Sequence, residues 1–401
     1  MAADTTGSRI GNLQPTHSSS PAGGRDLSLD AARGLIVALM ALDHVRIFFS
    51  EAQFNPVDLD QTTFGYFLTR WVTHLCAPGF FFIAGMGASL MAGKAGKARV
   101  ARFLVVRGVW LIALELLVFG FAWSFNPGWS WLGVIWSLGA SMIVMAGLIF
   151  VPRLLLLVVA AAFAAGHNAI SVNEPGPLVT VLYSGGFAQL PVLGPKIVLY
   201  SIVPWLALMA LGYAATPWLA PQGKPSSRRL LVVGATALAA FAVARLAGVG
   251  QSAWNGFTAY PEFWRTLSSF LNVDKYPPSL QFSLLMLGLM AVFLAYAAAP
   301  RNRRGLVEIC AVYGRVPFFF YAIHLFLIHG AALALATALG WPHEQLVWKG
   351  VGPNLTPPDG YGLPLIGVYA AWFAVLLALY PACTWFGAVK DRSRLWWIRF
   401  L

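Results

Sequence analysis

The sequence predicts an all-α, polytopic integral membrane protein with about ten transmembrane helices, or eleven. Hydrophobic residues make up 58% of the 401 residues and charged residues only 10%, whereas a soluble domain carries about a quarter charged residues. The mean hydropathy is +0.69. A chain this apolar has too few polar side chains to cover a water-soluble surface, and no polar stretch is long enough to form a separate soluble domain.

Ten apolar segments are long enough to cross the membrane, because a helix needs about 20 residues to span roughly 30 Å of hydrocarbon. In chain order they are 31–50, 64–92, 103–124, 131–150, 153–170, 196–218, 228–248, 279–299, 316–338 and 362–388. Residues 1–24 are rich in Ser, Gly, Ala, Thr and Pro and are predicted to form a disordered tail. This leaves 25–401 as a single transmembrane domain.

The basic residues predict the orientation of the helices. Most of the 27 lysines and arginines fall on the side of the N-terminus, as in the runs 94–107, 224–229 and 301–304. Because cytoplasmic loops are enriched in these residues, both termini are predicted to lie inside. This placement in cytoplasmic loops also explains the net charge of +12, so the charge does not indicate a nucleic-acid partner.

Ionisable residues interrupt the first predicted helix. Each costs at least a few kcal/mol in a membrane and therefore suggests a function. Asp43, His44 and Arg46 lie in its outer half, with His44 about 20 Å from the inner end. Arg46 is three residues from Asp43 and can pair with it. We expect Asp43 and His44 to be catalytic and Arg46 to bind substrate; the alternative is a cluster that only ends the helix.

The second predicted helix carries Arg70 and His74 on one face, four residues apart. A cation beside an imidazole favours the neutral form that a general base requires. Pro78 removes a hydrogen bond near residue 74, a local break that is common at membrane sites. We expect His74 to be catalytic and Arg70 to bind substrate; the alternative is a packed helix with an interfacial arginine.

Two further segments supply candidate substrate contacts. His324 and His329 lie in the ninth predicted helix, where each could instead be a hydrogen-bonded packing residue. Lys275, Tyr276 and Ser279 precede the eighth, where helix amides beside a lysine could bind a carboxylate, phosphate or sulfate. The alternative for this second segment is that its residues only hold the loop in place.

Other chemistry is not indicated. Cys76, Cys310 and Cys383 have no paired spacing, so neither a disulfide nor a metal site is predicted. The chain has no Walker loop, GxGxxG, HExxH or GxSxG motif for ATP, a Rossmann cofactor, zinc or a serine nucleophile. Glu115, in the third predicted helix, could neutralise a buried cation, but the sequence names no partner for it.

Several short motifs occur together in a distinctive order: 28–34, 39–46, 73–85, 275–280, 314–321 and Trp396-Trp397. From about residue 25 to its end, the chain thereby resembles bacterial membrane proteins similar to heparan-alpha-glucosaminide N-acetyltransferase. The resemblance implies a bacterial inner-membrane acyltransferase that takes an acetyl or other short acyl group from cytoplasmic acyl-CoA. The acceptor is expected to be an amine or hydroxyl of a glycan or glycolipid on the opposite side, and a homodimer is left open.

The resemblance also suggests roles. His44, oriented by Asp43 or another carboxylate, would be the base or a transient acyl carrier. His74, Arg70 or the amides at Ser279 would contact the oxyanion or the substrate. Basic residues on the inner side could attract the CoA phosphates, with Arg33 and Arg315 as the expected cofactor contacts. The alternative is that these basic residues only fix the topology of the helices.

The chain departs from the family at one point. The resemblance implies a histidine just after the first helix, as in the lysosomal enzyme of the family, and segment 50–63 contains none. His44 or His74 must therefore replace it, or the activity differs or is absent. The alternatives to an enzyme are a transporter or flippase with an intramembrane His, Asp and Arg pathway, and a non-catalytic membrane component.

Overall fold

The computed structural model describes residues 26–126, 131–170, 172–251, 255–302, 304–347 and 357–393. The predicted tail 1–24 and Trp396-Trp397 lie outside these residues. The helices are α1 (Leu27–Phe49), α2 (Phe64–Val72), α3 (Cys76–Ala95), α4 (Lys97–Leu114), α5 (Gly120–Ser124), α6 (Val134–Leu148), α7 (Arg153–Gly166), α8 (Pro177–Val179), α9 (Ile202–Leu219), α10 (Ser227–Leu246), α11 (Phe263–Leu271), α12 (Leu280–Ala298), α13 (Leu306–Arg315), α14 (Pro317–Leu339) and α15 (Leu365–Arg392). The strands are β1 (Trp131–Leu132), β2 (Gly186–Leu190) and β3 (Gly194–Val198).

Each of the ten predicted membrane segments overlaps one of these helices. In the described chain, seven helical stretches are long and apolar enough to cross a membrane: Phe64–Ala95, Lys97–Ser124, Ile202–Leu219, Ser227–Leu246, Leu280–Ala298, Pro317–Leu339 and Leu365–Arg392. Helices α6 and α7 are apolar but shorter. The prediction of a mostly helical, polytopic membrane protein is confirmed, whereas ten spans with both termini inside stay predictions.

A small sheet corrects the all-α prediction at two places. Strand β3 pairs in parallel with β1 and antiparallel with β2, giving the order β1-β3-β2. The predicted helical segments 131–150 and 196–218 therefore begin as strands, and α6 and α9 start only at Val134 and Ile202. The reason is that a short apolar run has no period that separates a buried strand from a buried helix.

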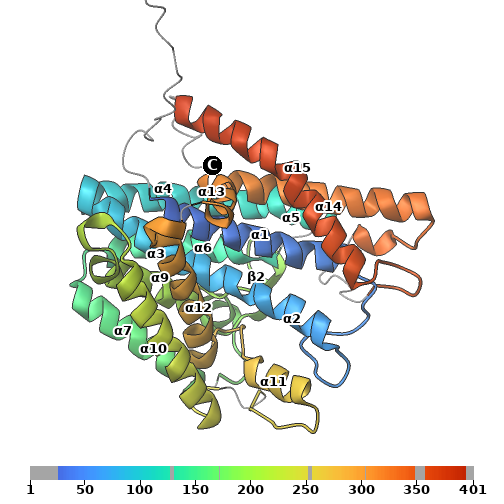
Figure 1. Cartoon of the computed structure of the whole chain (residues 1–401), viewed down its shortest axis with the longest axis horizontal. Helices are drawn as coiled ribbons and strands as arrows, with labels where there is room; N and C mark the ends of the chain where they lie inside the picture. Colours follow the sequence, from blue (N-terminus) through green and yellow to red (C-terminus); the bar gives the residue numbers. More distant parts are fainter. Residues whose placement is uncertain are drawn as a thin grey trace, which may run out of the picture.

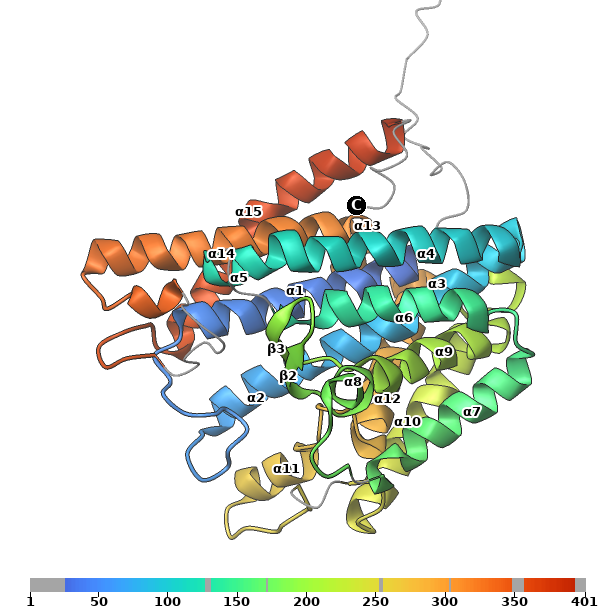
Figure 2. The ribbon, with the colours of Figure 1, turned by 180° about the vertical axis from the view of Figure 1, so that it is seen from behind.

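Helix α1 lies in the middle of the bundle, although it carries four charged residues. Figure 1 shows α4, α5 and α14 along one side of α1 and α7 and α10 on the other, while α15 crosses the outside obliquely. The reverse view shows the same arrangement, with β2 and β3 over α1 (Figure 2). Because α1 packs against α3, α12, α13, α14 and α15, its polar side chains face protein rather than lipid.

Glycines allow α1 and α13 to touch along their backbones. A Cβ at Gly34 would lie 1.7 Å from the carbonyl oxygen of Cys310, and one at Gly314 would lie 1.7 Å from that of Asp30. Helices in membranes commonly pack closely through small residues in this way. This crossing fixes the position of α1, which carries Asp43 and His44.

We expect Gly314→Ala to lower the free energy of unfolding by at least about 1–3 kcal/mol, because the added methyl group overlaps a backbone that side-chain rotation cannot move. Gly330→Ala is the matched control, since a Cβ there meets nothing within 4 Å. The control should keep or slightly raise stability, because alanine is the better helix former. Thermal unfolding of the two purified proteins in one detergent measures the difference, and equal midpoints would contradict the tight crossing.

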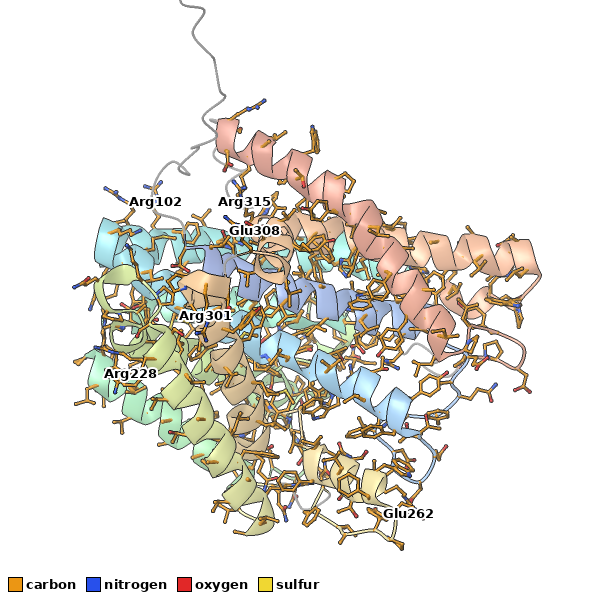
Figure 3. The ribbon with its side chains drawn as sticks, in the orientation of Figure 1. Arg102, Arg228, Glu262, Arg301, Glu308 and Arg315 are labelled. Carbon is orange, nitrogen blue, oxygen red and sulfur yellow. The ribbon has the colours of Figure 1, made fainter. Side chains whose placement is uncertain are left out.

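Four arginines gather toward one end of the bundle. Arg102, Arg228, Arg301 and Arg315 lie there together with Glu308, and Glu262 lies toward the opposite end (Figure 3). An arginine-rich end is the one expected to face the cytoplasm.

Candidate active site

A cavity of about 640 Å³ lies beside the second half of α1, next to α2 and the loop before α12. Its walls include parts of the loops 52–57 and 272–276, so it lies on the side predicted to be extracytoplasmic. Seven of the ten predicted catalytic and substrate-binding residues line it: Asp43, His44, Arg46, Arg70, His74, Lys275 and Tyr276. We call it the central cavity.

Hydrogen bonds between loops hold the rim of the central cavity. The Asn272 side chain donates to the carbonyl oxygen of Val57 at 3.1 Å. Farther out, Arg265 pairs with Asp60 at 2.7 Å, which joins α11 to the loop after α1. The cavity wall is therefore assembled from segments that are about 200 residues apart in the sequence.

Asp43 pairs with two arginines. Its Oδ1 lies 3.1 Å from Nη2 of Arg46, and its Oδ2 lies 2.5 Å from Nη1 of Arg70. Arg46 follows Asp43 by three residues on the same helix, as predicted, whereas Arg70 comes from α2. Two cations share one carboxylate, so the group keeps a net positive charge at the cavity wall.

His44 is hydrogen-bonded to His324, which the sequence predicted only as a substrate contact. Nδ1 of His44 lies 2.8 Å from Nε2 of His324. Nδ1 of His324 lies 2.6 Å from the carbonyl oxygen of Tyr321 and 3.0 Å from that of Phe320. His324 is fully buried behind His44 and does not line the central cavity.

This chain of contacts assigns the proton on each ring. A carbonyl oxygen only accepts, so Nδ1 of His324 must carry its hydrogen. Nε2 of a neutral His324 then accepts, and Nδ1 of His44 must be the donor. Nε2 of His44 keeps its lone pair, which is the form that a general base requires.

The prediction that Asp43 orients His44 is wrong. Both carboxylate oxygens of Asp43 are engaged by arginines, and His324 holds the imidazole. Consecutive residues on an α-helix point about 100° apart, so adjacent side chains rarely meet. The ring of His44 is packed instead against Trp123, whose centroid lies 4.7 Å away.

His74 lies at a break between two helices. Residues Thr73–Leu75 form a 3₁₀ turn that separates α2 from α3, in the region where Pro78 predicted a disruption. The side chain is buried and lines the central cavity. Its Nδ1 has no hydrogen-bond partner within the described part of the chain.

Lys275 and two tyrosines form the wall that faces α1. The Lys275 ammonium lies 5.0 Å from the ring centroid of Tyr276 and 5.8 Å from that of Tyr200. The two tyrosine hydroxyls are 3.2 Å apart. Burial raises the pKa of Tyr200; burial acts in the same direction on Tyr276, but Lys275 and Arg70 outweigh it and lower the pKa of Tyr276.

Ser279 and His329, both predicted to contact substrate, lie outside the central cavity. Ser279 caps α12 by accepting from the amide of Phe282, and its own amide donates to Asp274, so no free amide at Ser279 faces an anion. The ring nitrogens of His329 lie 2.8 Å from the carbonyl oxygens of Ala122 and Leu346. These contacts give both residues a structural role.

The two residues predicted to contact CoA are also ion-paired. Arg33 pairs with Asp30 at 3.0 Å, within α1. Arg315 pairs with Asp391 of α15 at 2.6 Å, and both of these side chains are about half exposed. Neither arginine lines the central cavity.

Several residues that line the cavity were not among the predicted site residues. Trp123, Tyr200 and Tyr321 are aromatic residues at apolar segments, where packing is the usual role. Glu115 was noted, but its partner is the backbone amide of Gly133 and not a cation. Spacing in the sequence gave no signal for the contact of Glu115, because it joins a helical turn to the backbone after a strand.

The chain matches a known family over more than half of its length. The family model described as heparan-alpha-glucosaminide N-acetyltransferase, catalytic, matches residues 25–251, which is more than half of the chain. The matched part includes Asp43, His44, Arg70 and His74. Among curated proteins, none matches the chain.

Proposed function

Because the chain belongs to the heparan-alpha-glucosaminide N-acetyltransferase catalytic family, we propose that it transfers an acetyl or other short acyl group from cytoplasmic acyl-CoA. The acceptor in this proposal is an amine or hydroxyl of a sugar on the extracytoplasmic side of the bacterial inner membrane. The observation that carries the proposal is the hydrogen bond between His44 and His324 in a cavity with cationic walls, from which we infer a free lone pair on Nε2 of His44.

His44 is the general base in this mechanism. As the acceptor nitrogen or oxygen attacks the thioester carbonyl, its proton passes to Nε2 of His44, which becomes an imidazolium. The tetrahedral intermediate then collapses, the carbon–sulfur bond breaks, and the thiolate of CoA leaves. The proton on His44 returns to that thiolate, so the base is regenerated and the products are the acylated acceptor and CoA.

Cations beside His44 suit the charge that develops during the transfer. The carbonyl oxygen becomes an oxyanion in the intermediate, and preorganised donors at that oxygen accelerate acyl transfer. Arg70 and Lys275 line the same cavity. Of these two residues, Arg70 is ion-paired to Asp43. In our proposal these two residues and the Tyr276 hydroxyl stabilise the oxyanion, while His74 contacts the substrate.

A smaller pocket supports the position of the acyl group. It has a volume of about 50 Å³ and reaches from His44 past Met40, Cys76 and Phe80, toward the predicted cytoplasmic side. Since one water needs about 10–15 Å³ measured in this way, the pocket has room for a few heavy atoms. In our proposal it receives the acyl end of the donor.

We expect turnover to fall as the acyl chain lengthens from acetyl to butanoyl to octanoyl, because a long chain does not fit this pocket without moving Met40 or Phe80. Met40→Ala should shift the preference toward the longer donors. Release of free CoA thiol with each acyl-CoA, in wild type and variant, measures the effect. A preference for octanoyl-CoA in the wild type would show that the acyl group binds elsewhere.

Purified protein in nanodiscs with labelled acetyl-CoA and simple amino sugars tests the proposed function directly. We expect labelled sugar and one free CoA for each transfer. Label retained on His44 would instead indicate an acyl-enzyme intermediate. Folded protein that gives neither product nor adduct, yet carries protons across liposomes without acyl-CoA, would replace the enzyme with a transporter.

A further inference from the structure

Glu115 is a buried carboxyl group in the wall of the central cavity, and the mechanism above does not use it. It lies at the end of α4, where residues Glu115–Phe119 form a π-helical turn before α5. Such single turns inside α-helices occur frequently at functional sites. The side chain is only 3% exposed.

The two oxygens of Glu115 differ in their contacts. Oε1 accepts a hydrogen bond from the backbone amide of Gly133 at 2.9 Å. Oε2 is buried and has no hydrogen-bond partner among the residues that the structure describes. A buried polar atom without a partner is unfavourable, so each such atom in a native fold needs an explanation. A ligand in the cavity would supply the missing donor.

The neighbouring sheet holds Gly133 in place against Glu115. Gly133 directly follows β1, whose two residues pair with Ile197 and Val198 of β3. A Cβ at position 133 would lie 2.3 Å from Oε1, so only glycine allows the amide to reach the carboxyl group. The fold therefore fixes Oε1 on a rigid strand end and leaves Oε2 free.

We propose that Oε2 of Glu115 accepts a hydrogen bond from an N–H or O–H group of the acceptor, which makes Glu115 an acceptor-binding residue. This inference rests on the proposed function. A sphere with the volume of the cavity is about 11 Å across, so an acceptor of sugar size can contact both His44 and Glu115. Trp123 and Trp131 line the same cavity, with ring centroids 6.2 Å apart, and offer faces for a sugar ring.

Two variants test this role, with the Michaelis constants for donor and acceptor measured separately. Glu115→Gln keeps the size of the side chain and an oxygen for the Gly133 amide, but places an NH₂ donor where Oε2 accepted. Gly133→Ala keeps the carboxyl group and displaces it. We expect both to raise the KM for the acceptor by roughly 10- to 100-fold, the loss typical of removing one partner of a buried hydrogen bond, with the KM for acetyl-CoA unchanged.

D-glucosamine and D-glucose as acceptors identify the donor group on the ligand. A larger effect of Glu115→Gln on glucosamine indicates that the amino group donates to Oε2, and equal effects on both sugars indicate a hydroxyl. Glu308→Gln is the control, because Glu308 is exposed on α13, lies beside Arg315 (Figure 3) and does not line the cavity. The control should keep both Michaelis constants.

The outcomes separate this inference from the proposed function. Measurable turnover with an unchanged acceptor KM in Glu115→Gln overturns the role of Glu115 and leaves the acyltransferase standing. A wild type that releases no CoA with any acceptor contradicts the acyltransferase. Sugar binding then still decides the role of Glu115, because glucosamine or glucose should raise the Tm of the wild type but not that of Glu115→Gln.

Discussion

His44→Gln is expected to lower kcat by roughly 10²- to 10⁴-fold, the usual contribution of a general base. Glutamine is polar and of similar size, but its amide nitrogen cannot take a proton from the attacking group at neutral pH. The KM for acetyl-CoA should change little, since the loss falls on the transition state. Steady-state release of CoA thiol by the purified variant measures both constants.

The control for this variant is His343→Gln. His343 is half-buried, bonds to the carbonyl oxygen of Trp341 and lies outside the central cavity, so its variant should keep wild-type kinetics. If His44→Gln is folded and retains the wild-type kcat, His44 is not the base and the proposed mechanism fails.

His324 adds a second check on the same base, as a positioning residue. His324→Gln can still present an acceptor to Nδ1 of His44, whereas His324→Leu cannot, so Nε2 of His44 would no longer be held as the free nitrogen. We expect the leucine variant to lose most of kcat and the glutamine variant to recover part of it. If His324 had a structural role only, activity would fall in proportion to stability in each variant, and the glutamine variant would show no specific recovery of kcat.

The individual helices could be predicted from the sequence because a membrane imposes a length and an apolar character on each of them. Ionisable residues in these helices also indicated where a site would be, and Asp43, His44, Arg70 and His74 share one cavity. The hydropathy of a segment depends only on the residues of that segment, so a single sequence is enough to identify it. Hydropathy does not by itself set the number of spans, because α6 and α7 are apolar but shorter than the other candidate spans.

The contacts within the site depend on how distant elements pack, which local patterns do not encode. His44 and His324 are 280 residues apart, and neither carries a signal for the other. Ser279 looked like an anion site because helix N-termini often bind anions, but its hydroxyl and amide satisfy the backbone around it. His329 and His44 both lie in predicted membrane helices, yet the sequence does not say which face of a helix carries each ring.

Asp43→Asn should lower the free energy of unfolding by about 3 kcal/mol, near the lower end of the range for breaking a buried ion pair. The side chains of Asp43, Arg46 and Arg70 are each about 15% exposed, so water screens them only in part. Asparagine leaves two guanidinium groups close together without a countercharge. Thermal and denaturant unfolding of the purified variant in detergent measures the loss.

The double variant Asp43→Asn with Arg46→Gln separates charge from shape. In the wild type, one carboxylate and two guanidinium groups leave a net charge of +1; Asp43→Asn alone raises it to +2, and the double variant returns it to +1. If uncompensated charge causes the loss, the double variant must be more stable than the single one although it has one more substitution. If instead the loss comes from the geometry of the hydrogen bonds, the second substitution can only destabilise further. A double variant below the single variant in stability would therefore show that Asp43 acts as a geometric tie between α1 and α2 and not as a countercharge.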